Sequence, residues 1–176
     1  LVTNSVMAAS GTSPNDATWG DFNNDGNLDL IVANYQGEHD FFYRNVWTDG
    51  LPIVPPTLQK VEAFLKYTER AADEVIGVLH PSQAAATIWK VAVNGVMAGC
   101  RPEYMPILVA MVEVMATPQF GLKHGGSTPG WEAMIILNGP ISEQLGFNHG
   151  LGVQRPGNQA NTSIGRFYRL FARNVP

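Results

Sequence analysis

The chain has 176 residues, of which 45% are hydrophobic and 15% are charged, so it can bury a core. This length is sufficient for one domain, or for a small domain plus a fragment. It contains a single cysteine, Cys100, which excludes an intrachain disulfide and a four-cysteine zinc site. It has no run of about 18 apolar residues, so we expect no membrane span.

The formal net charge of −4 is distributed unevenly along the chain. Residues 1–46 hold six acidic residues and one basic residue, a net of −5, whereas residues 47–176 hold nine acidic and ten basic residues, a net of +1. Clustered acids suit a cation site and disfavour nucleic acid. The second part has no basic stripe with interleaved aromatic residues, so we expect no nucleic-acid partner. The contrast predicts two unlike domains, residues 1–46 and residues 47–176.

The first part contains a loop with the spacing of a calcium site. Oxygen-bearing side chains stand at positions 1, 3, 5 and 9 of the loop, and Gly26 at position 6 permits the positive φ of so tight a turn. Ca²⁺ takes six to eight hard oxygen ligands, and a backbone carbonyl at position 7 would add one more. The predicted ligands are Asp21, Asn23, Asp25, Asn27 and Asp29. The alternative is a turn rich in Asn and Asp that holds no metal.

The residues around this loop favour strands rather than the helices of an EF-hand. An EF-hand loop ends in a bidentate glutamate at position 12, where this chain has Val32. Residues 28–32 and 41–43 are mostly aliphatic or aromatic, and we predict that both segments are strands.

The first part resembles the FG-GAP/VCBS repeat of integrin-like β-propellers at residues 19–21, 21–29, 32–35 and 42–45. The resemblance covers residues 1–45 and implies a Ca²⁺-binding propeller blade of a secreted or cell-surface protein. One repeat is present here, whereas propellers need several blades to protect their strand edges. Three arrangements stay open: packing on the second part, pairing with other copies in an assembly, or fusion of a fragment to unrelated sequence.

The second part alternates predicted helices and strands, which is typical of an α/β or α+β layered domain. Apolar periodicity and capping residues predict helices at residues 57–69, 83–98, 102–115 and 161–173, with a short helical turn at 141–145. Short apolar runs predict strands at residues 74–79 and 133–137.

Cys100 is the first candidate for chemistry. It falls between two predicted helices, just before the N-terminus of the second, where free N–H groups and the helix dipole stabilise negative charge. The neighbouring Arg101 adds a full positive charge, and both effects favour the thiolate. We therefore predict that Cys100 is a nucleophile or redox thiol and that Arg101 contacts the substrate. The alternative is a buried, inert cysteine at a helix corner.

A glycine-rich loop at residues 150–163 is the second candidate. It leads into the N-terminus of a predicted helix, a place suited to phosphate or carboxylate, and its arginine could add a bidentate contact. The predicted ligand-binding residues are Arg155, Gly157, Asn158, Asn161 and Thr162. The spacing is neither the Walker nor the dinucleotide pattern, so no nucleotide cofactor is expected. An ordinary capped helix is the alternative.

Further polar residues follow the other predicted strands. Loops at strand ends are where open α/β folds place ligands, so Ser127, Thr128 and Asn138 are candidate substrate-binding residues. His124 and His149 lie in glycine-rich segments, and each is a candidate general base. The alternative for each histidine is a structural role.

The second part is similar to bacterial proteins associated with the UGSC (seleno)proteins at residues 49–57, 94–104, 138–140 and 156–166. UGSC proteins are named for a selenocysteine-Gly-Ser-Cys motif. The resemblance implies a thiol- or selenol-dependent bacterial enzyme or subunit, with Cys100 and the glycine-rich loops as its site. This chain has neither a UGSC nor a CGSC motif. If the redox centre lies in that motif, this chain is a partner or substrate-binding subunit, and a UGSC-type partner protein supplies the redox centre. The second part suggests a cytoplasmic location, whereas the first suggests secretion or the cell surface.

Two functions of different classes follow from these patterns. The leading one is a thiol-dependent enzyme or subunit, an oxidoreductase or lyase, that acts on a small anionic molecule and carries an accessory Ca²⁺ repeat. The alternative is a non-catalytic extracellular module for adhesion or self-assembly, which would form homo-oligomers. Convergence of Cys100, a histidine and Arg155 in one pocket would favour the enzyme, and a buried Cys100 would favour the module.

Overall fold

The computed structural model describes residues 16–20, 29–33, 41–43, 49, 51–80, 82–122 and 132–175. The chain divides into two compact units, Leu1–Pro55 and Pro56–Pro176. The boundary predicted between residues 46 and 47 lies earlier along the chain and stays a prediction.

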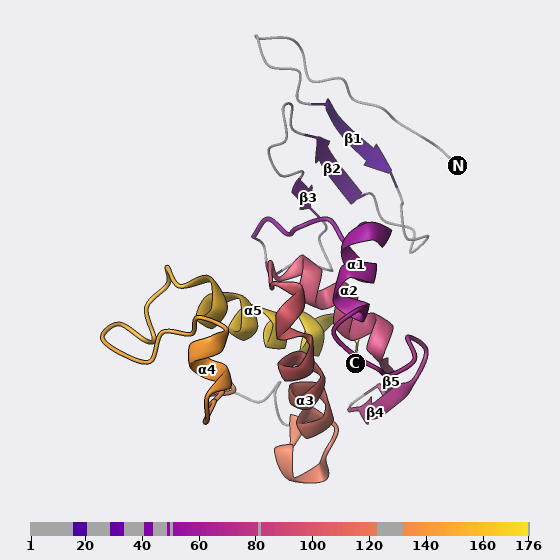
Figure 1. Cartoon of the computed structure of the whole chain (residues 1–176). Helices are drawn as coiled ribbons and strands as arrows, with labels where there is room; N and C mark the ends of the chain where they lie inside the picture. The colour runs from indigo at the N-terminus through magenta and orange to yellow at the C-terminus, as the bar shows by residue number, and fades with distance from the viewer. Residues whose placement is uncertain are drawn as a thin grey trace. The chain divides into compact units, whose positions relative to one another are not determined.

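The first unit contains an antiparallel three-stranded sheet in the order β1 (Asp16–Gly20), β2 (Asp29–Ala33) and β3 (Phe41–Tyr43) (Figure 1). Trp19 lies opposite Leu30, and Ile31 lies opposite Phe42. The strands predicted near residues 28–32 and 41–43 are therefore confirmed. Of the predicted Ca²⁺ ligands, Asp29 is the first residue of β2, and the other four lie outside the described residues.

The second unit is a mixed α+β layered domain in which a two-stranded antiparallel sheet packs with helices. Its strands are β4 (Val75–Leu79) and β5 (Ala84–Thr87). The α-helices are α1 (Leu58–Leu65), α2 (Ile88–Met97), α3 (Met105–Met115), α4 (Ile141–Gln144) and α5 (Gln159–Asn174), and the 3₁₀ turns are η1 (Pro102–Tyr104) and η2 (Pro118–Phe120). The described strands pair only antiparallel, so the α+β alternative of the prediction holds and the α/β alternative does not.

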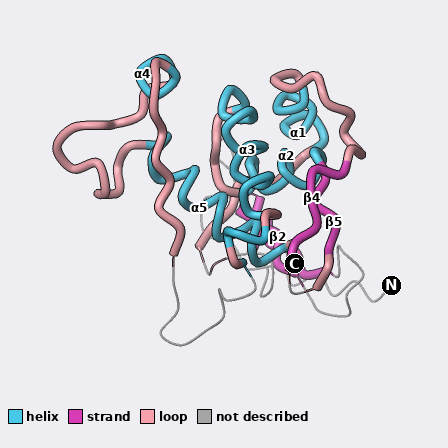
Figure 2. The backbone as a smooth tube through the Cα atoms, turned by 90° about the horizontal axis from the view of Figure 1, so that it is seen from below, coloured by secondary structure: helices cyan, strands magenta, loops and turns pink. Residues whose placement is uncertain are grey.

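Helix α2 lies at the centre of the core of this unit and packs against α1, α3 and α5 (Figure 2). Fully buried side chains of the neighbouring helices include Leu108 of α3 and Phe167 and Phe171 of α5. Gly95 lets α1 and α3 approach closely, because a Cβ atom there would lie 2.7 Å from Phe64 Cε1 and 2.8 Å from Leu108 Cδ1.

The predicted helix over residues 83–98 begins later than expected, at Ile88. The three alanines of β5 have high helix propensity, but they pair with β4, so tertiary pairing overrides propensity. Thr87 then ends the strand and caps the helix, since its side chain accepts a hydrogen bond of 3.2 Å from Lys90 N. The helix predicted at residues 57–69 corresponds to α1, which ends at Leu65, before the predicted end. The helices predicted at 102–115 and 161–173 correspond to η1 with α3 and to α5. The turn predicted at 141–145 corresponds to α4, and the strand predicted at 74–79 corresponds to β4.

The prediction that residues 133–137 form a strand of a sheet is wrong. The segment runs nearly straight toward α4 (Figure 2), but its backbone makes no hydrogen bond to any described residue. Exposure alternates along it, with Met134 and Ile136 exposed and Ala133, Ile135 and Leu137 half-buried. The exposure therefore alternates with the period of two of a strand, although no described strand pairs with the segment.

Candidate functional site

The corner between α2 and η1 holds Cys100 inside the core. Gly99 adopts a left-handed φ of 77°, Gly99 N donates to Val96 O at 2.9 Å, and Cys100 N donates to Gly95 O at 3.0 Å. These two bonds form a Schellman motif, which ends the helix and places an apolar residue directly after the glycine against the helix. Cys100 occupies that apolar position, and its residue surface is 8% exposed.

Burial raises the pKa of the Cys100 thiol from about 9 to about 12. The hydroxyl of Ser163, which has no other hydrogen-bond partner among the described residues, faces the thiol and opposes this shift without reversing it. The sequence predicts the opposite direction, a lowered pKa next to Arg101. Desolvation of the buried thiol is the largest influence on its pKa, so the thiol is protonated at neutral pH.

The Cys100 corner and the glycine-rich loop lie against each other, although about 50 residues separate them in the sequence. Gln159 Nε2 donates to Gly99 O at 3.2 Å. Arg101 Nη2 donates to Leu145 O at 2.7 Å, and its guanidinium lies 4.9 Å from the centre of the Tyr104 ring. Arg101 therefore holds the start of the loop in place, and the substrate contact predicted for it stays a prediction.

Asn158 and Asn161, both predicted to bind ligand, make hydrogen bonds that hold the loop between α4 and α5 closed. Asn148 N donates to Asn161 Oδ1 at 2.9 Å, and Asn161 Nδ2 donates to Asn148 O at 3.0 Å and to Val153 O at 3.3 Å. Asn158 Oδ1 accepts from Asn161 N at 3.1 Å, and its Nδ2 donates to Gly146 O at 3.1 Å. The amide groups of both residues are thus engaged in structure.

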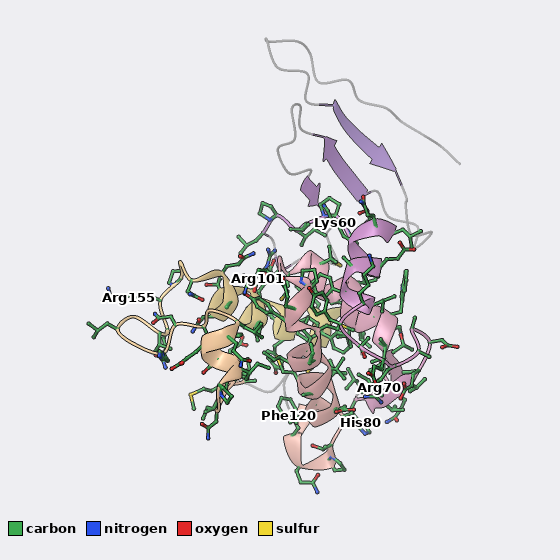
Figure 3. All side chains as sticks on the ribbon, viewed as in Figure 1. Lys60, Arg70, His80, Arg101, Phe120 and Arg155 are labelled. Carbon is green, nitrogen blue, oxygen red and sulfur yellow. The ribbon has the colours of Figure 1, made fainter. Side chains whose placement is uncertain are left out.

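A hollow of about 520 Å³ lies within this loop, and the residues that line it are Asn148, Leu151, Gly152, Arg155, Pro156, Gly157 and Asn158. Gly152 has a φ of 77°, and Arg155 N donates to Gly152 O at 2.8 Å, so the chain turns back and the arginine stem lies over the glycine. The guanidinium of Arg155 has no ion-pair partner among the described residues. Figure 3 shows Arg155 on the outer loop and Arg101 nearer the helices.

The structure does not bring all the predicted site residues together. Arg155, Gly157 and Asn158 line the hollow, whereas Cys100, His149 and Asn138 do not. His149 is exposed, and its Nε2 lies 4.0 Å from Glu143 Oε1. Thr162 is exposed on the first turn of α5. The other predicted residues, His124, Ser127 and Thr128, lie outside the described residues.

Asn148 is a site residue that the sequence analysis did not identify. It lines the hollow. Its Oδ1 accepts a hydrogen bond of 3.0 Å from Gly150 N, and this bond closes a turn over residues 148–150. An asparagine two residues before a glycine is a common signal for such a turn, so the sequence of residues 148–150 already indicated a turn here.

Within the described residues, no group of three or more His, Cys, Asp and Glu side chains is placed to hold a metal ion. No helix in the described part of the chain is long and apolar enough to cross a bilayer. No protein-family model, curated protein or solved structure matches the chain.

Proposed function

We propose that the unit Pro56–Pro176 is a ligand-binding subunit of a thiol-dependent enzyme, and that it takes a small anionic molecule in the hollow at residues 148–158. The observation that carries this proposal is the exposed Arg155 guanidinium, which has no ion-pair partner in the described residues and lines a hollow of about 520 Å³. That volume is in the range of small-molecule sites. A guanidinium can bind a carboxylate or phosphate through two parallel hydrogen bonds.

The charge of the surrounding sequence supports an anion. Residues 144–176 contain no Asp or Glu and four arginines, of which Arg155 lines the hollow and Arg169 pairs with Glu132. Arg155 is the one charged residue among those that line the hollow, so a positive charge with no acidic residue beside it in the lining attracts an anion. The loop that forms the hollow is also held by the side-chain bonds of Asn158 and Asn161, so little ordering would be needed when the ligand binds.

The reactive thiol in this proposal comes from another chain. Cys100 is the only cysteine, and its burial, which raises its pKa to about 12, disfavours a thiolate at neutral pH. Any disulfide step also requires a second thiol from another molecule. The resemblance of residues 47–176 to UGSC-associated proteins supports a UGSC-type partner as the source of that thiol.

The first unit is proposed as an accessory Ca²⁺-binding repeat. Its β1 and β2 are antiparallel with Gly20 opposite Asp29, so residues 21–28 form the connection between paired strands. A strand–loop–strand setting is what the FG-GAP/VCBS resemblance implies for the predicted ligands. A non-catalytic adhesion module remains the second candidate, and the buried Cys100 is the observation that favours it.

Calorimetric titration of the full chain with inorganic phosphate and with succinate, at low ionic strength, tests the proposed ligand site. We expect binding of at least one of these anions, a loss of roughly tenfold or more in affinity for Arg155→Ala, and a smaller loss for Arg155→Lys. Lys66→Ala is the matched control, because it removes an exposed cation from the C-cap of α1 and should leave affinity unchanged. Equal affinity of wild type and Arg155→Ala, or no binding of either anion, would contradict the proposal.

A further inference from the structure

The segment of residues 133–137 has the sequence Ala-Met-Ile-Ile-Leu and a backbone that pairs with none of the described residues. None of its N–H or C=O groups is hydrogen-bonded to a described residue, although the segment runs nearly straight and alternates in exposure (Figure 2). A row of unpaired backbone groups on an apolar extended segment is a template for another strand. Its length of five residues is typical of a strand in a globular protein.

The side chains of this segment are apolar on both faces, which is the pattern of a strand that is covered on both sides. Met134 and Ile136 are nevertheless 74% and 76% exposed. Together with α3, the segment lines an apolar hollow of about 460 Å³, and Val114 of α3, which is 54% exposed, lies on its wall. This combination of exposed apolar side chains marks an interaction surface.

We infer that a second copy of this chain covers the segment, through antiparallel pairing of residues 133–137 of the two copies around a two-fold axis at Ile135. In an isologous contact, each residue of one copy must pack favourably against its symmetry-related residue in the other copy. In this register Met134 lies opposite Ile136 of the other copy, Ala133 lies opposite Leu137, and Ile135 lies opposite its own counterpart. All of these are apolar cross-strand pairs, which stabilise a sheet.

The charges are compatible with this register. The nearest charged residue, Glu132, lies opposite the neutral Asn138 of the other copy, so no like charges meet across the strands. The carboxylate of Glu132 is already neutralised within its own chain by an ion pair with Arg169. An extended peptide is the occupant that can pair with these N–H and C=O groups through the hydrogen bonds of a sheet, which a small molecule or a bilayer does not offer.

Sedimentation velocity of the full chain over a range of concentrations, with Ca²⁺ and with EGTA, measures the association. We expect a concentration-dependent species of twice the 19.1 kDa chain mass under both conditions. Ile136→Glu should abolish this species, and because Ile136 is exposed this variant should keep the monomer folded, which circular dichroism verifies. Leu58→Glu is the matched control, since it changes an apolar residue of α1 that is 62% exposed and should leave the dimer intact.

A cysteine at the two-fold axis tests the register. In a Cys100→Ala background, Ile135→Cys should form a covalent dimer under mild oxidation, whereas Leu58→Cys should not, because only the first places two thiols opposite each other. A wild-type chain that stays at 19.1 kDa at every concentration would overturn the inference, and so would dimers that survive Ile136→Glu or an Ile135→Cys variant that fails to cross-link.

Discussion

Asn161 holds Asn148 through a reciprocal pair of hydrogen bonds, with Asn148 N donating to Asn161 Oδ1 at 2.9 Å and Asn161 Nδ2 donating to Asn148 O at 3.0 Å. One amide side chain on the first turn of α5 thereby satisfies both backbone groups of a residue 13 positions earlier. The candidate ligand loop begins at Asn148 and ends at the N-cap of α5. This contact therefore joins the start of the loop to the first turn of α5.

Asn161→Ala removes this contact and should loosen the loop. It leaves the N–H and C=O of Asn148 without their partner, so we expect a loss of about 1–3 kcal/mol in the free energy of unfolding, measured by urea denaturation. Amide exchange should accelerate at residues 148–153. Thr162→Ala, on the exposed side of the same helical turn, is the control and should change stability by less than about 0.5 kcal/mol. Equal stability of the two variants would contradict this role of Asn161.

Gly95→Ala should destabilise the helical core. The added methyl would lie within 2.8 Å of side-chain carbons of Phe64 and Leu108, both buried, so the helices must move apart. We expect a loss of about 1–3 kcal/mol in thermal or urea unfolding. Gly165→Ala in α5 offers the opposite case, because a Cβ there meets no atom within 4 Å, and we expect a gain of about 0.5–1 kcal/mol. A stabilising Gly95→Ala would show that α1, α2 and α3 pack less closely than described.

Calcium binding by the first unit is tested independently of the ligand loop. We expect the full chain to bind Ca²⁺ in a calorimetric titration and Asp25→Ala to weaken that binding at least about tenfold, because the substitution removes a charged oxygen ligand from the middle of the predicted loop. Asp40→Ala, which removes an acid outside residues 21–29, should bind Ca²⁺ like the wild type. The calcium assignment fails if the wild type takes up no Ca²⁺ or if both variants behave alike.

The parts of the fold that the sequence predicts are those controlled by local pattern. Helix α5 has apolar residues at Ile164, Phe167, Leu170 and Phe171, all on one helical face, and all are buried as predicted. Strand β5 was not predictable in the same way, because Ala84, Ala85 and Ala86 favour a helix locally and only their pairing with β4 makes them a strand.

In the candidate site too, the features set by neighbouring residues in the sequence were predictable, whereas those set by tertiary packing were not. Gly152 and Gly157 do lie in a loop with positive φ values, as a glycine-rich sequence predicts. The environment of Cys100 was harder to predict, because Arg101 and the nearby helix N-terminus are visible in the sequence, whereas the packing of α5 over the thiol is not. A glycine directly before the cysteine at the end of an apolar helix was the one local signal for a Schellman motif and hence for burial.

The most direct test of this account is the rate at which iodoacetamide alkylates Cys100 as a function of pH, in the native chain and in denaturing urea. A thiol with a pKa raised to about 12 contains little thiolate near pH 8, and burial hinders the reagent as well. We predict a native rate roughly a hundredfold or more below the unfolded rate, still rising with pH up to pH 10. In a Cys100→Ala background, Thr162→Cys supplies an exposed thiol on α5 as the control and should react in the native chain nearly as fast as in urea. A native rate for Cys100 that equals or exceeds the unfolded rate, and that stays level below pH 8, would show an activated thiolate and would contradict the assignment of the reactive thiol to another chain.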